Sequence, residues 1–147
     1  MYRTEHDLVG KKQIDQEAYY GIHSLRAAEN FPITNQRLPG AMIVSMAWIK
    51  KACARANRMA GVLPGRIADA IERACDDLIA GKLHDQFIVD PIQGGAGTST
   101  NMNANEVIAN RAIELLGGKK GDYSLVHPND HVNCGQSTND IYPTCVK

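Results

Sequence analysis

The sequence predicts a mainly α-helical fold. In three segments, residues 40–60, 64–80 and 100–116, apolar residues recur at intervals of three and four, the spacing that places them on one face of a helix. Glycine or proline stands near the ends of these segments, where helices begin and stop. Only residues 9–14 are typical of a strand, and they are too few for a central sheet.

Residues 1–38 lack sustained helical periodicity, so we expect an irregular N-terminal arm. Within the arm, residues 9–14 are expected to form a short strand and residues 17–21 a turn or a helical segment. The first residues are polar and charged, unlike a signal peptide. No apolar run has the length of a membrane span, so no membrane partner is expected.

The first two helices are predicted from their apolar stripes. The stripe of segment 40–60 consists of Met42, Met46, Ile49, Cys53, Ala56 and Ala60. Lysines and arginines, among them Lys50, fall mostly elsewhere on this helix. The stripe of segment 64–80 consists of Ile67, Ile71, Ala74 and Leu78. We expect both stripes to be core.

A third helix is expected to begin at Thr98 or Asn101 and to end at Leu116, with Ile108, Ala112 and Leu115 facing the core. It follows residues 85–97, where a proline and three glycines within four positions predict an extended connection and a loop. Residues 119–135 are expected to form a long loop, a feature that is often functional.

The last segment, Ser137-Thr138-Asn139-Asp140, combines capping side chains with an acidic residue in the first turn of a helix. Only seven residues follow it. We therefore expect the chain to be a fragment of a longer protein.

Charge and cysteine content exclude several classes of function. Lys plus Arg and Asp plus Glu both total 16, so the chain has no basic footprint for nucleic acid or anionic lipid. The four cysteines are scattered and have no histidine at ligand spacing, which argues against a zinc site and a disulfide framework. We expect no metal and a cytoplasmic location.

Two polar segments carry the functional signal: residues 94–103 and 135–140. Each places hydroxyl and amide side chains where a helix begins, and a helix start offers free N–H groups and partial positive charge to an anion. Asparagines at 101, 103 and 105 are unusual inside a helix and suggest a buried polar site. The alternative is that these side chains only cap helices and bond to loops.

The motifs resemble those of the aspartase/fumarase superfamily. The resemblance covers residues 94–107, 127–140 and 19–27, together with Asn30-Phe31. Residues 84–99 resemble the aspartate ammonia-lyases, whereas class II fumarases typically have a Trp-Gln-Thr-Gly-Ser-Gly-Thr-Gln-Ser type of sequence here. Gly135 departs from the pattern, which more often has serine or cysteine.

This resemblance implies an L-aspartase-like fold, with a lyase domain over residues 1–140 and the start of a central helical bundle at 141–147. It implies reversible deamination of L-aspartate to fumarate and ammonia in a homotetramer, without metal or organic cofactor. One alternative is a class II fumarase acting on malate and fumarate. For the fragment alone, another alternative is a non-catalytic carboxylate-binding or assembly module.

The resemblance also implies roles for single residues. Thr98, Ser137 and Thr138 would hold the carboxylate that gains charge during the reaction, and Asn139 would position the amino group. Ser99 and Asn101 are expected to support them.

A second anion site is implied at His127, Asn129 and Asp130, with His127 a loop histidine rather than a catalytic base. The family's catalytic serine lies on a Gly-Ser-Ser-x-Met-Pro-x-Lys-x-Asn loop, and this sequence has no such loop. We therefore expect no catalytic residue within the chain.

Overall fold

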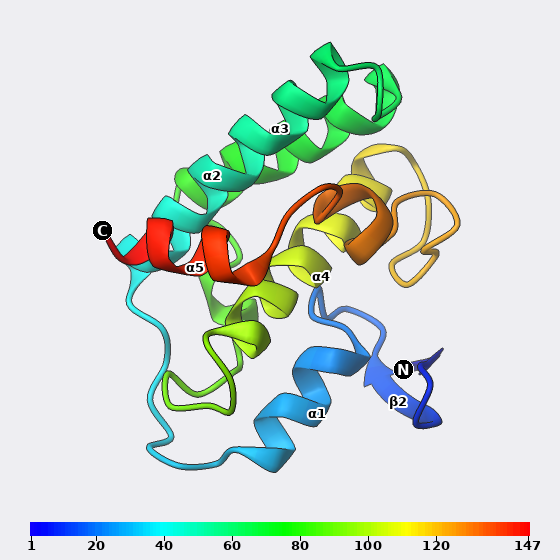
Figure 1. Ribbon diagram of the computed structural model, residues 1–147. Helices are drawn as coiled ribbons and strands as arrows, with labels where there is room; N and C mark the ends of the chain where they lie inside the picture. Colours follow the sequence, from blue (N-terminus) through cyan, green and yellow to red (C-terminus); the bar gives the residue numbers. More distant parts are fainter.

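The computed structural model describes residues 1–147 and is mainly helical (Figure 1). Its five α-helices are α1 (Ile22–Asn30), α2 (Gly40–Met59), α3 (Gly65–Ile79), α4 (Thr98–Leu115) and α5 (Thr138–Val146). The strands β1 (Tyr2–His6) and β2 (Lys11–Asp15) form an antiparallel pair with Tyr2 opposite Asp15. None of the helices combines the length and the apolar character that a bilayer span requires. The predicted fold class is confirmed.

The three helices predicted from apolar spacing are confirmed, with ends that differ by one or two residues. α2 and α3 lie side by side, and α4 packs against α3 so that the main core lies among the three (Figure 1). Ile71 and Leu78 of α3 and Ile108 of α4 are almost completely buried in this core. α5 packs against both α2 and α4.

The buried face of α2 differs from the predicted stripe. Its buried residues are Ile43, Met46, Ala47, Lys50 and Ala54. Ala56 and Ala60, predicted to face the core, are exposed. The prediction that Lys50 lies away from the core is wrong, because α2 packs against α3 and also against α5, which widens its buried surface.

The N-terminal arm is more regular than predicted. The strand expected at residues 9–14 is the second strand of a hairpin, and α1 follows it. The two strands and α1 show no apolar pattern in the sequence, because each strand buries one residue and α1 buries only Ile22 and Ser24. The segments expected as connection and loop also contain short turns, the 3-10 helix η1 (His84–Gln86) and the π-helical turn η2 (Pro128–Val132).

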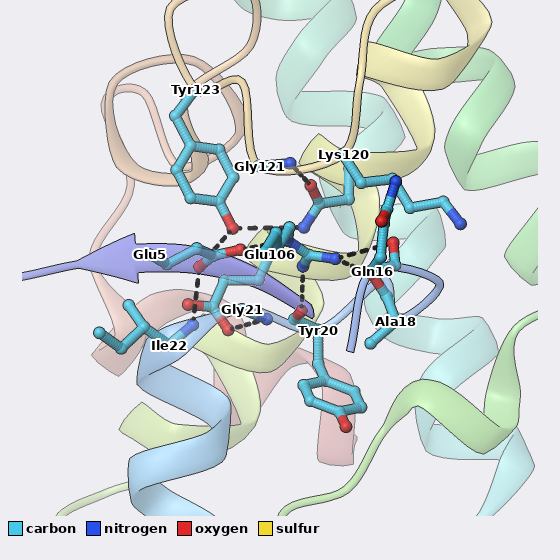
Figure 2. A network of polar contacts seen from close by, with 12 residues as sticks. Glu5, Gln16, Ala18, Tyr20, Gly21, Ile22, Glu106, Lys120, Gly121 and Tyr123 are labelled. Atoms are coloured by element: carbon cyan, nitrogen blue, oxygen red, sulfur yellow. Dashed lines mark hydrogen bonds and ion pairs between the residues drawn. The ribbon is translucent and has the colours of Figure 1, made fainter. Parts of the chain in front are cut away.

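Two buried carboxylates, Glu106 of α4 and Glu5 of β1, hold the start of α1 (Figure 2). Glu106 accepts hydrogen bonds at 2.8–3.0 Å from the backbone N–H groups of Gly21, His23 and Ser24. Glu5 accepts one from the N–H of Ile22 at 2.9 Å. Together the two carboxylates satisfy the free N–H groups of a helix that has no capping side chain of its own.

Tyr123 and Arg3 complete this polar contact between hairpin, helix and loop. Burial raises the pKa of Tyr123 well above its usual value, so the phenol keeps its proton and donates a hydrogen bond to Oε2 of Glu5 at 3.1 Å. Arg3 donates to Glu5 at 2.8 Å. The Arg3 guanidinium also donates at 2.8–3.2 Å to the carbonyl oxygens of Asp15, Gln16, Ala18 and Tyr20.

We expect Glu106→Ala to lower the free energy of unfolding of the 147-residue chain by at least about 3 kcal/mol, because several buried donors lose their acceptor at once. Urea denaturation measures this change. Asp69→Ala is the control, since its carboxylate pairs with Arg58 at the surface and its loss should cost less than about 1 kcal/mol. Equal effects of the two variants would contradict the role assigned to Glu106.

Candidate functional site

The two polar segments lie at the starts of α4 and α5. α4 begins at Thr98, directly after Gly97, and α5 begins at Thr138, directly after Ser137. Asn101 of α4 donates a hydrogen bond from Nδ2 to Oγ1 of Thr138 at 3.0 Å. The structure therefore brings the two segments into contact.

Two glycines permit this arrangement. Gly97 has a φ of +87°, and a Cβ atom at this position would lie 2.2 Å from the ring of Tyr142 on α5. Both the backbone conformation and the lack of space therefore require glycine. Gly135, where the resemblance led us to expect serine or cysteine, has a φ of +67°. Glycine adopts this left-handed conformation without strain.

Most of the predicted binding residues lie on the surface at these two helix starts, whereas Asn101 is buried behind them. Thr98, Ser137 and Asn139 are exposed, whereas Ser99 and Thr138 are half-buried. Ser137 is the N-cap of α5, and its Oγ accepts a hydrogen bond from the N–H of Asn139 at 3.2 Å. An anion at this helix start would meet exposed hydroxyl groups and the positive end of the helix dipole.

Behind this surface lies a group of buried and half-buried polar side chains, which we term the amide cluster: Lys50, Asn101, Asn105, Asn133 and Gln136. Oδ1 of Asn133 accepts three hydrogen bonds, from Lys50 at 2.9 Å, Asn101 at 3.1 Å and Asn105 at 3.3 Å. Lys50 also donates to Oε1 of Gln136 at 2.8 Å. The buried polar site expected from the helical asparagines therefore exists for Asn101 and Asn105.

Asn103 fits the alternative explanation, in which a helical asparagine only bonds to a neighbouring loop. Its Oδ1 accepts a hydrogen bond from the N–H of Ile88 at 2.9 Å, and its Nδ2 donates to the carbonyl of Gln86 at 3.1 Å. Asn103 therefore holds the connection that precedes α4 and takes no part in the amide cluster.

Lys50 is the member of the cluster that sequence reasoning missed. Its side chain is 0% exposed, and burial lowers its pKa from 10.5 to about 7. The thiols of Cys53 and Cys75 oppose this shift but do not cancel it. Lys50 stands four residues after Met46 and four before Ala54, so helical spacing could have placed it on the buried face.

His127, Asn129 and Asp130 lie together at the start of η2. Nδ1 of His127 accepts hydrogen bonds from the N–H groups of Asn129 and Asp130, each at 3.2 Å. With Nδ1 occupied as an acceptor, Nε2 is the ring nitrogen that can donate a hydrogen bond to an anion. A cavity of about 50 Å³ is lined by His127 and Asn129 together with His6 and His23.

Comparison with known proteins places this helical domain among the lyases. The model of the family described as "Lyase" matches residues 10–147. The chain is 58% identical over 145 residues to the aspartate ammonia-lyase of Bacillus subtilis (strain 168) and 53% identical over 145 residues to the class II fumarate hydratase of Halobacterium salinarum. These alignments cover 99% of this chain and 30% and 31% of the two relatives, so the chain spans about a third of their length.

The crystal structure of fumarate lyase:delta crystallin from Brucella melitensis in native form superposes with a TM-score of 0.98 at 54% identity. It is matched over 99% of this chain and 34% of its own. The chain therefore belongs to the lyase family, and the resemblance to the aspartase/fumarase superfamily is confirmed.

We expect the free energy of unfolding to rise with pH between about pH 7.5 and about pH 9, by up to about 1.4 kcal/mol per pH unit from Lys50 alone. The lowered pKa means that the unfolded chain binds one more proton than the folded chain in this range, so raising the pH favours folding. Urea denaturation at both pH values measures the slope, and Lys50→Met should remove the contribution of Lys50.

Lys51→Met is the matched control, because Lys51 lies next to Lys50 but pairs with the exposed Asp76. It should retain the slope of the wild type. A slope that is the same in Lys50→Met and in the wild type would contradict the lowered pKa.

Proposed function

We propose that this chain is the N-terminal part of an enzyme that converts L-aspartate reversibly to fumarate and ammonia. The observation that carries the proposal is the contact between the starts of α4 and α5, which sets exposed hydroxyl groups beside a helix N-terminus. Such a surface suits a carboxylate. The 58% identity to the aspartate ammonia-lyase of Bacillus subtilis (strain 168) supports aspartate as the substrate.

In this reaction a base removes a proton from the carbon beside the side-chain carboxylate, and that carboxylate gains negative charge. Thr98, Ser137 and Thr138 would donate hydrogen bonds to it, and the positive end of α5 would stabilise it further. Donors that bind this charge more strongly in the transition state than in the substrate accelerate the reaction. Asn139 would position the amino group, with Ser99 and Asn101 in support.

The remaining parts of the site would come from outside this chain. We propose that the base and the groups that hold the second carboxylate lie in the longer protein, within a cytoplasmic homotetramer that uses no metal or organic cofactor. Residues 1–140 would then form the first domain, and residues 141–147 would begin a central helical bundle. His127, Asn129 and Asp130 would bind a second anion away from the reacting one.

A class II fumarase is the second candidate. The 53% identity to the class II fumarate hydratase of Halobacterium salinarum favours it, since the same carboxylate surface would suit malate. The two candidates differ in the group that leaves, ammonia or water.

An assay of the full-length enzyme on aspartate and on malate separates these candidates. We expect release of ammonia and formation of fumarate from aspartate, with no comparable turnover of malate. The purified 147-residue chain should release no ammonia, because it lacks the proposed base. Turnover of malate alone would overturn the assignment of aspartate.

In the full-length enzyme, Thr98→Ala, Ser137→Ala and Thr138→Ala should each lower kcat by about 10²–10³, equivalent to about 2.7–4 kcal/mol of transition-state stabilisation. Cys53→Ala and Cys75→Ala serve as controls that should leave kcat unchanged, since Cys75 lies in the helical core and Cys53 packs against it. Near-normal turnover by a folded Thr138→Ala enzyme would show that the carboxylate site is elsewhere.

A further inference from the structure

Lys50 lies on the buried side of α2, against the segment that leads into α5. Its Nζ donates hydrogen bonds to Oδ1 of Asn133 at 2.9 Å and to Oε1 of Gln136 at 2.8 Å. Both acceptors are neutral amides, so neither offers a carboxylate partner to the buried amine. Burial of this amine costs desolvation free energy that an apolar side chain of similar size would avoid.

The two acceptors belong to a closed turn directly before the N-cap of α5. Nδ2 of Asn133 donates to the carbonyl of Gln136 at 3.0 Å, and Nε2 of Gln136 donates to the carbonyl of Val132 at 2.9 Å. Gln136 is followed immediately by Ser137. The position of this turn relative to α2 therefore sets the position of the first residues of α5.

The same turn is connected to the hydroxyl group of Thr138 by a second route. Nδ2 of Asn101 donates both to Oδ1 of Asn133 and to Oγ1 of Thr138, at 3.1 and 3.0 Å. A displacement of Asn133 would therefore also move the partner of the Thr138 hydroxyl. A further bond from α2 to the turn runs from Nδ2 of Asn57 to the carbonyl of Cys134 at 2.8 Å.

We propose that Lys50 is a positioning residue for the carboxylate-binding start of α5, which it fixes through Asn133 and Gln136. This inference rests on the proposed function of Ser137 and Thr138. Lys50 does not touch the substrate, since its side chain is fully buried behind the helix start. Its role is to keep the two hydroxyl groups directed at one carboxylate, where a displacement of about 1 Å can cost about 10²-fold in rate.

The test is the steady-state kinetics of full-length Lys50→Met on aspartate, with succinate as an unreactive dicarboxylate inhibitor. We expect kcat to fall by up to about 10²-fold, KM to rise, and the inhibition constant of succinate to rise with it. A variant that is merely less stable would lose active enzyme while its KM and its affinity for succinate stayed normal. Lys51→Met should match the wild type in all three quantities.

A double-mutant cycle shows whether Lys50 acts through Thr138. If it does, Lys50→Met should lower kcat less in a Thr138→Ala background than in the wild type. Gln136→Met provides a second variant if Lys50→Met does not fold, because it removes the acceptor from the other end of the same hydrogen bond. It should change KM and kcat in the same directions.

The positioning role would be overturned if folded Lys50→Met had the KM and the succinate affinity of the wild type. If Lys50→Met does not fold, the same result in Gln136→Met would overturn it. Fully additive effects of Lys50→Met and Thr138→Ala would overturn it as well. Both results would leave the proposed function intact as long as the wild type deaminates aspartate. A wild type that acts only on malate would overturn the aspartate assignment, and the same comparison on malate would then test Lys50.

Discussion

One amide oxygen, Oδ1 of Asn133, joins the parts of the molecule that form the candidate site. It accepts hydrogen bonds from Lys50 of α2 and from Asn101 and Asn105 of α4. Asn133 itself lies in the turn that leads into α5. The helices α2, α4 and α5, which are distant in the sequence, are therefore linked through one acceptor. Such a contact fixes geometry more strictly than apolar packing, because a hydrogen bond requires both distance and direction.

α4 is the central element because it makes polar contacts to both sides of the fold. Near its start, Asn101 reaches Thr138 and so fixes the beginning of α5. One turn and a half later, Glu106 binds the N–H groups at the start of α1. Apolar residues such as Ile108 are buried in the core, where α4 packs against α3. The helix thus joins the candidate carboxylate surface to the N-terminal hairpin while contributing to the core.

Apolar spacing was sufficient to predict α2, α3 and α4, because their stripes face one common core. It could not predict α1 or β1, which are held by Glu5, Glu106 and Arg3 across long separations in the sequence. The polar segments were recognised from local chemistry, and their contact through Asn101 and Thr138 followed from the fold. Lys50 was missed because its charge suggested a solvated position, although its spacing matches the buried face of α2.

The crystal structure of the full-length enzyme with bound succinate would test most directly whether the start of α5 binds a substrate carboxylate. We expect one carboxylate of succinate within hydrogen-bonding distance of the hydroxyl groups of Thr98, Ser137 and Thr138, with the amide cluster unchanged behind them. Succinate bound only beside His127, with these hydroxyl groups free of ligand, would contradict the proposed site.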